Sequence, residues 1–142
     1  VGSTKFGNSN DDRHARTGSF EVVNAAGTML FDVDNSTETT QVRGLKVLYT
    51  EVTNTKITAS VPSYILGVSR TGSVEINIPA ASTYGAGSIL VVKDEVEARQ
   101  GVHHILLTCS SGYTIDGEDK FILTGSMPSI SLYSNGSNWF VF

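Results

Sequence analysis

The chain has 142 residues, of which 39% are hydrophobic and only 17% charged, and its formal net charge is −4. Because no cluster of Lys and Arg offsets this acidity, the chain lacks the basic surface that binds nucleic-acid phosphates, and no apolar run approaches the ~20 residues of a membrane-spanning helix. We therefore expect no nucleic-acid partner and no membrane insertion. The 14 glycines and the abundant Ser, Thr and Asn residues favour strands and turns over helices, so we expect an all-β protein.

The first part of the sequence predicts an extended, shaft-like segment. Residues 1–17 are polar and rich in turn formers, without apolar periodicity, and are expected to form an arm. Short runs of strand-forming residues follow, separated by turn-forming or polar residues, at 19–24, 28–34, 42–49 and 55–61. Asn24-Ala25-Ala26-Gly27 joins the first two runs and predicts a turn, in which Gly27 supplies a positive φ. These runs are weakly self-similar but have no fixed period. We predict an extended arm and a shaft-like β segment over residues 1–61.

A compact antiparallel β head is predicted over residues 62–142, where the strand signals sharpen. Three aliphatic residues alternate with two polar ones in Val74-Glu75-Ile76-Asn77-Ile78, a pattern typical of a half-buried strand. The runs 88–93 and 102–107 are denser in apolar residues and indicate strands covered on both faces. Residues 94–101 between them are compatible with a helix but too short to form more than a loop or a single turn.

The end of the chain predicts a β-hairpin. Asn135-Gly136 separates two runs of strand-forming residues, 129–134 and 137–142. An Asn-Gly pair between such runs favours a type I′ turn, because both central positions of that turn need a positive φ. We therefore expect the two runs to pair as antiparallel strands.

The last strand of this hairpin is apolar on both faces. Trp139 and Val141 share one face, and Phe140 and Phe142 share the other. A strand of this kind is covered on both faces, and a single small β layer supplies only one cover. We predict that one face packs inside its own subunit and that the other lies at or near a subunit interface.

Residues capable of catalysis or metal binding do not form a recognisable motif. In a strand, His103 and His104 would point to opposite faces and could not hold one ion within a chain, although one histidine per chain could meet its copies on a three-fold axis. The carboxylates at 94–97 and 116–119 lie in turn-like segments, where acids usually form turn hydrogen bonds, and Asp116-Gly117 predicts a tight turn. Cys109, the single cysteine, is expected to be a small buried residue. We predict no catalytic site, no metal site and no cofactor, and so no enzyme.

Four segments of the second half together resemble a known module. They are residues 72–82, 88–95, 112–117 and 129–139, and they include Ile78-Pro79-Ala80-Ala81, Val92-Lys93-Asp94-Glu95, Thr114-Ile115-Asp116-Gly117 and Leu132-Tyr133-Ser134-Asn135-Gly136-Ser137-Asn138-Trp139. In this order they are similar to a C-terminal module that recurs in phage tail fibres and related virion fibre proteins. His103, His104 and Cys109 are not part of that pattern.

This resemblance implies an intertwined homotrimer in the virion, exposed outside the host cell, with no catalytic residues to carry over. We expect a fibre component that mediates trimerisation and attachment to a host-surface receptor, with a glycan as the expected ligand. Tyr84, Tyr113 and Tyr133 are candidate binding residues, because aromatic rings stack on sugar faces and their hydroxyls form hydrogen bonds; packing in a hairpin or an interface is the alternative for each. Two other functions stay open: the trimerising end of a polysaccharide-depolymerising tailspike, and a purely structural virion module without a ligand.

Overall fold

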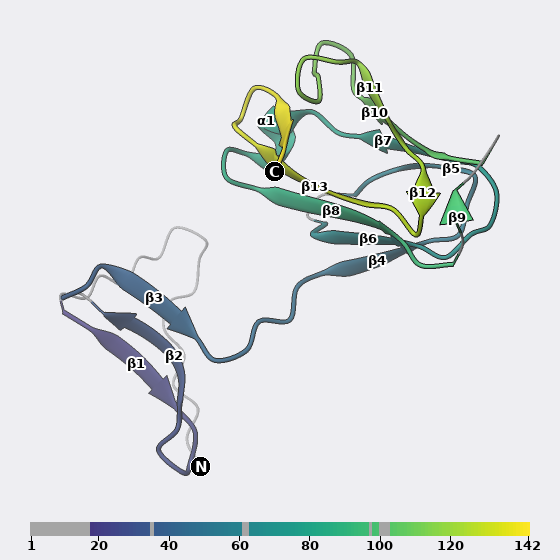
Figure 1. Cartoon of the computed structure of the whole chain (residues 1–142). Helices are drawn as coiled ribbons and strands as arrows, with labels where there is room; N and C mark the ends of the chain where they lie inside the picture. Colours follow the sequence, from purple (N-terminus) through teal and green to yellow (C-terminus); the bar gives the residue numbers. More distant parts are fainter. Residues whose placement is uncertain (1–17, 35, 61–62, 97, 100–102) are drawn as a thin grey trace, which may run out of the picture. The chain divides into compact units, whose positions relative to one another are not determined.

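A computed structural model of the chain describes residues 18–34, 36–60, 63–96, 98–99 and 103–142 (Figure 1). The elements found in these residues are fourteen strands and one four-residue helix, so the all-β prediction is confirmed. The predicted arm at 1–17 lies outside the described residues. The chain divides into two compact units, Val1–Lys46 and Val47–Phe142, whereas the sequence reading expected the boundary after residue 61.

The first unit contains a three-stranded antiparallel sheet in the order β1-β2-β3, with strands at Phe20–Val23, Met29–Asp34 and Thr39–Val42. The turn expected between the first two strands is present. Gly27 has a φ of +75°, and the Asn24 side chain accepts hydrogen bonds from the backbone N–H groups of Ala26 and Thr28, both at 2.9 Å. Strand β3 was not predicted, because its first two residues belong to a run that reads as polar linker.

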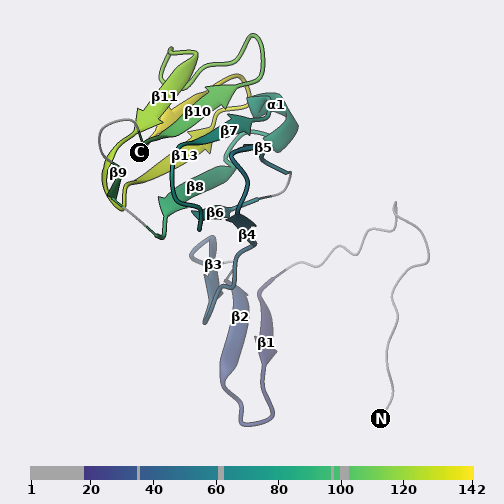
Figure 2. The same ribbon diagram turned by 90° about the vertical axis from the view of Figure 1, so that its right-hand side faces the viewer.

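The second unit consists of two main sheets (Figure 2). The five-stranded sheet has the order β14-β13-β8-β6-β4, and the four-stranded sheet has the order β11-β10-β7-β5. In chain order the strands of the two sheets are β4 (Tyr49–Val52), β5 (Lys56–Thr58), β6 (Ile65–Val68), β7 (Val74–Ile78), β8 (Ile89–Asp94), β10 (Ile105–Cys109), β11 (Lys120–Leu123), β13 (Ser129–Ser134) and β14 (Trp139–Val141). A small two-stranded sheet pairs β9 (Ala98–Arg99) with β12 (Gly125–Ser126).

The strands alternate between the two main sheets from β4 to β10. Between two neighbouring strands of one sheet, the chain forms a strand of the other sheet, so neighbouring strands of the same sheet run in the same direction. In this way β4, β6 and β8 are parallel neighbours, and so are β5, β7 and β10. Within the two main sheets, the antiparallel pairs come from β11, β13 and β14. The expectation of an antiparallel head therefore holds only in part, because the two main sheets mix parallel and antiparallel pairs.

One hydrophobic core lies between the two sheets and takes every second residue of their strands. The alternation predicted for β7 is confirmed, since its three aliphatic residues are at most 1% exposed. From the five-stranded sheet come Leu66, Val68, Leu90, Val92, Ile130, Leu132 and Trp139, and from the four-stranded sheet come Val74, Ile76, Ile78, Ile105, Leu107 and Leu123. Burial of these aliphatic side chains is the main source of stability in a fold of this size.

The predicted hairpin exists, but its turn differs from the prediction. Strands β13 and β14 pair antiparallel, and Gly136 has a φ of +89°, yet Asn135 is not among the residues with a positive φ. A four-residue loop joins the strands, held by the Asn135 side chain, which accepts hydrogen bonds from the backbone N–H groups of Ser137 and Asn138, both at 2.8 Å. The two-residue turn with two positive φ angles occurs instead at Asp116-Gly117, with φ of 51° and 90°, where a tight turn was expected.

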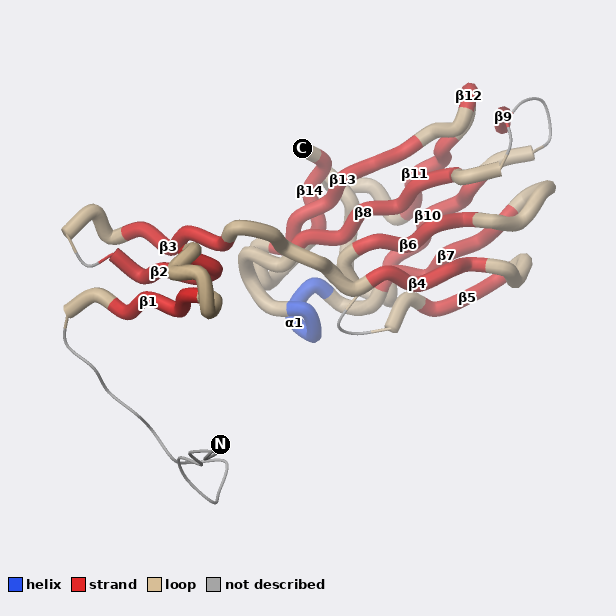
Figure 3. Tube along the Cα trace, turned by 90° about the horizontal axis from the view of Figure 1, so that it is seen from below, coloured by secondary structure: helices blue, strands red, loops and turns tan. Residues whose placement is uncertain are grey.

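The helix of the described residues, α1 (Ala81–Tyr84), is the blue segment in Figure 3. It follows β7 rather than β8, and residues 98–99 of the stretch thought compatible with a helix form strand β9. No helix in the described part of the chain has the length and apolar character needed to cross a bilayer.

Candidate functional site

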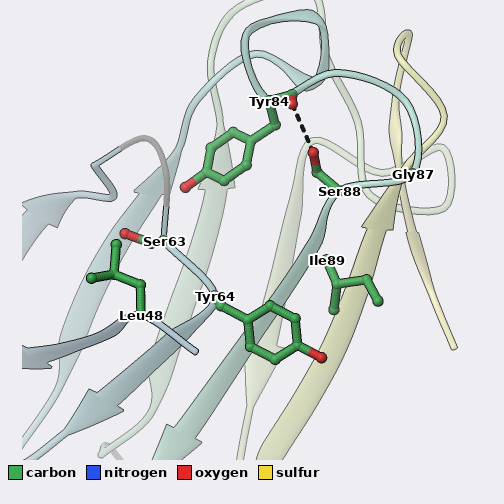
Figure 4. A pocket seen from close by; sticks show the side chains of 7 residues that line it. All are labelled: Leu48, Ser63, Tyr64, Tyr84, Gly87, Ser88 and Ile89. Carbon is green, nitrogen blue, oxygen red and sulfur yellow. Dashed lines mark hydrogen bonds between the residues drawn. The ribbon is translucent and has the colours of Figure 1, made fainter. Parts of the chain in front are cut away.

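A pocket opens at the end of the five-stranded sheet where the three parallel strands β4, β6 and β8 begin. It has a volume of about 330 Å³ and is lined by Leu48, Ser63, Tyr64, Tyr84, Gly87, Ser88 and Ile89. Leu48 directly precedes β4, Ser63 and Tyr64 precede β6, and Ser88 and Ile89 lead into β8, so the parallel winding brings three distant segments to one place. Tyr84 reaches the pocket from the end of α1 (Figure 4).

The pocket wall at Tyr84 is fixed by several contacts. The Tyr84 hydroxyl donates a hydrogen bond to the carbonyl oxygen of Ser60 at 2.8 Å, and the ring meets the buried Trp139 ring edge-on, with centroids 5.0 Å apart. The Ser88 hydroxyl donates to the backbone carbonyl of Tyr84 at 2.7 Å. Burial raises the pKa of Tyr84, and a hydrogen bond with Ser63 partly opposes that rise. The Tyr84 side chain is therefore neutral and preorganised at ordinary pH.

The chemistry of the pocket suits an uncharged ligand with both apolar and hydroxyl-bearing faces. All seven lining residues are uncharged. Tyr64 and Tyr84 supply aromatic rings, Leu48 and Ile89 supply aliphatic surface, and the serine and tyrosine hydroxyls donate and accept hydrogen bonds. A pocket that is mainly apolar with a few fixed polar groups is the usual form of a small-molecule site.

The three candidate tyrosines, Tyr84, Tyr113 and Tyr133, do not lie together in the structure. Two of them, Tyr84 and Tyr133, belong to a helix and a strand rather than to loops. Tyr84 is the last residue of α1 and lines the pocket. Tyr113 packs against the core, and its hydroxyl forms a 2.8 Å hydrogen bond with the Ser82 hydroxyl. Tyr133 lies in strand β13 and is 39% exposed. Its ring stacks on Phe140 with centroids 5.5 Å apart.

Tyr64 is the pocket residue that sequence reasoning missed. It stands next to the expected domain boundary, where no periodicity marks it as part of an element. The useful signal is its position immediately before the run Ile65–Val68, which forms one of three parallel strands that start at this end of the sheet. Recognising the parallel winding would have placed Tyr64 next to the first residues of β8.

The residues considered for metal binding or catalysis do not converge. Within the described residues, no group of three or more His, Cys, Asp or Glu side chains could hold a metal ion. His103 and His104 precede β10 rather than lying in it, so the expected alternation of faces does not apply to them. Burial, followed by the charge of Asp119, raises the pKa of the Cys109 thiol to about 11, which makes it a poor nucleophile at neutral pH.

A buried ion pair holds the segment after β8. The Arg99 guanidinium donates from Nε to Asp94 Oδ2 at 2.7 Å and from Nη2 to Asp94 Oδ1 at 3.1 Å, and both side chains are fully buried. The same guanidinium donates to the backbone carbonyls of Arg70, at 2.8 Å, and Gly72. These contacts tie the loop before β7 to the end of β8. The sequence gives no local sign of this pairing.

No protein-family model matches the chain, and no curated protein matches it either.

Proposed function

We propose that this chain is a structural component of a virion fibre that assembles as a homotrimer and attaches to a host-surface glycan. The observation that carries the attachment part is the uncharged pocket between Tyr64 and Tyr84. The resemblance of four ordered segments to a fibre module supports the virion setting. The two-sheet, all-β architecture is compatible with that setting.

A sugar ring is the ligand class that this pocket fits best. Pyranose rings have apolar C–H faces that pack on aromatic side chains, and their hydroxyls need partners that both donate and accept hydrogen bonds. Tyr64 contributes a ring, and Ser88 keeps acceptor capacity on a hydroxyl whose proton is already committed to Tyr84. The absence of any charged group among the lining residues favours a neutral sugar over an acidic one.

The test is glycan binding by matched tyrosine variants. An array of neutral and acidic oligosaccharides is probed with the wild-type chain, and the affinity of any binder is then measured for Tyr64→Ala, Tyr64→Phe and Tyr113→Phe. We expect binding to a neutral glycan that Tyr64→Ala weakens by about 2-fold to about 10-fold, since stacked aromatic contacts contribute about 0.5–1.5 kcal/mol beyond the area that they bury.

The Tyr113→Phe variant is the control, because it removes a hydroxyl that bonds to Ser82 away from the pocket. Equal weakening by Tyr64→Ala and Tyr113→Phe would contradict the assignment of the pocket. Absence of any glycan ligand would favour a purely structural module, and cleavage of an arrayed polysaccharide would favour a depolymerising tailspike.

A further inference from the structure

Part of the outer face of the five-stranded sheet is apolar. Paired residues in neighbouring strands share a face, so the registers define two adjacent rows on the side away from the core. The first row consists of Phe140, Tyr133 and Ile89, and the second of Phe142, Ser131, Val91, Ile65 and Tyr49. Seven of these eight side chains are aromatic or aliphatic. We call them the apolar band; it crosses all five strands, four of which follow one another as β13, β8, β6 and β4 in Figure 2.

Three side chains of the apolar band are substantially exposed to solvent, and the other five are partly buried. Phe142 is 65% exposed, Tyr49 48% and Tyr133 39%. The three rings at the β14 edge form one cluster, in which Tyr133 stacks on Phe140 and meets Phe142 edge-on at a centroid distance of 5.9 Å. An ordered aromatic cluster at the edge of an apolar sheet face is typical of an interaction surface.

The outer face of the four-stranded sheet is mainly polar and serves as a comparison within the same unit. Its registers place Lys56, Glu75, Leu106 and Ile122 in one row and Thr58, Asn77, Thr108 and Lys120 in the next. Six of these eight residues are polar, and Lys56 and Glu75 form an ion pair with an N···O distance of 2.7 Å. The apolar band therefore departs from a solvent-facing pattern that the other sheet of the same unit follows.

We propose that the apolar band packs against the apolar bands of two other copies of this chain around a common axis. This inference rests on the homotrimer of the proposed function and names the surface that would hold it together. Ile89 belongs both to the band and to the pocket wall, so the pocket lies beside the proposed contact.

The chemistry of the band favours another copy of this chain over a glycan. Ser131 and the two tyrosine hydroxyls are the polar side-chain groups of the two rows, too few to satisfy a polysaccharide. The next row carries one basic and one acidic residue, Lys93 and Glu51, separated by Gly67. A second acidic residue, Glu95, accepts a hydrogen bond from Tyr49 of the band, so both signs of charge border the band. Copies of this face therefore meet without the repulsion that a single sign of charge would cause.

The apolar band by itself is smaller than a stable interface. With strands about 4.8 Å apart and alternate residues about 7 Å apart along a strand, two rows on five strands cover roughly 300 Å² of sheet. A stable two-chain interface buries about 800 Å² per partner. The band is therefore the apolar centre of the proposed contact, which needs further buried surface around it.

The experiment compares a charge placed on each outer face. Val91→Glu introduces a carboxylate at the centre of the band, and Ile122→Glu introduces the same group on the other outer face, where Ile122 is 54% exposed. Phe142→Ser is a second band variant, at the end of the chain, where no core residue is altered. Sedimentation velocity across a wide concentration range gives the mass of each, and circular dichroism and thermal melting monitor the fold.

We expect a wild-type trimer, a rise of roughly 30-fold or more in the concentration at which Val91→Glu and Phe142→Ser dissociate, and no change for Ile122→Glu. If both band variants stay trimeric, or if Ile122→Glu weakens the trimer as much as they do, the proposed surface is wrong. The proposal of a trimer is unaffected by either result. A wild-type monomer would remove the trimer as well. Glycan binding by Tyr64 variants is read separately, so failure of attachment and failure of this surface are distinguished.

Discussion

The Tyr49 ring lies directly over the backbone of Gly67: a Cβ atom at position 67 would meet the Tyr49 ring and hydroxyl at 2.5 Å, and Glu95 Oε1 at the same distance. Gly67 is not among the glycines with a positive φ, so a side chain here is opposed by the space that Tyr49 and Glu95 occupy rather than by backbone conformation. The Tyr49 hydroxyl donates a 2.9 Å hydrogen bond to Glu95 Oε2. That bond, together with desolvation and the charges of Glu95 and Glu51, holds the pKa of Tyr49 above its ordinary value.

Gly67→Ala is expected to displace the Tyr49 ring and break its bond to Glu95. The pKa of Tyr49 should then fall toward its ordinary value of 10.0, because the neutral phenol loses the acceptor that favours it. NMR titration of the labelled tyrosine ring measures this change. Gly44→Ala is the matched control, since nothing lies within 4 Å of a Cβ atom there. An unchanged pKa in Gly67→Ala would contradict the contact.

The Tyr49–Glu95 bond also predicts a dependence of stability on pH. A group whose folded-state pKa is raised stabilises the fold below its unfolded pKa and loses that contribution as the pH rises through the folded value. Stability from this pair should therefore be present at neutral pH and decrease above about pH 10. Urea unfolding at several alkaline pH values should show a smaller decrease for Tyr49→Phe than for the wild type.

Removing one partner of the buried Asp94–Arg99 pair should be strongly destabilising. Asp94→Ala leaves a fully buried guanidinium without its counter-charge, and such losses cost about 3–5 kcal/mol. The double variant Asp94→Leu/Arg99→Met should be less destabilised than Asp94→Ala, because no buried charge is left unpaired. Chemical denaturation of the three proteins checks this order, and a double variant weaker than the single one would contradict it.

The two aromatic neighbours in β14 should respond differently to truncation. Trp139 is fully buried and donates from Nε1 to the Pro79 carbonyl at 3.0 Å, so Trp139→Ala should cost about 3–5 kcal/mol in the free energy of unfolding. Phe140 lies on the outer face, and Phe140→Ala should cost clearly less while weakening assembly. Unfolding and mass measured against concentration separate the two effects. Equal responses in both measurements would mean that the strand has no distinct inner and outer faces.

Cys109 should react slowly with alkylating reagents in the folded protein. Its thiol has a pKa raised from 9.0 to about 11, and since the thiolate is the reactive form, alkylation near pH 8 should be about 100-fold slower than in the unfolded chain. The raised pKa also means that the neutral thiol stabilises the fold below about pH 9 and that this contribution disappears as the pH approaches 11. Alkylation rates with and without urea, followed by mass spectrometry, check the expectation. Similar rates in both conditions would contradict it.

The sequence by itself determined the class of the fold and several of its local features. The alternation along Val74–Ile78 and the turns at Asn24–Gly27 and Asp116-Gly117 all appear in the structure as predicted. These features depend on side chains within a few residues of one another, through the two-residue period of a strand and the φ preference of glycine. Local chemistry of this kind can be read directly from the order of residues.

Only the tertiary structure decided which strands are neighbours, and with them the pocket and the apolar band. The parallel pairing of β4, β6 and β8 joins segments separated by a pass through the other sheet, and no local pattern specifies such a partner. Tyr64 reaches the pocket, and Tyr49 reaches Gly67, through that pairing alone. The pairing depends on how the whole chain buries its aliphatic residues between two sheets, which is a property of the complete core rather than of any one segment.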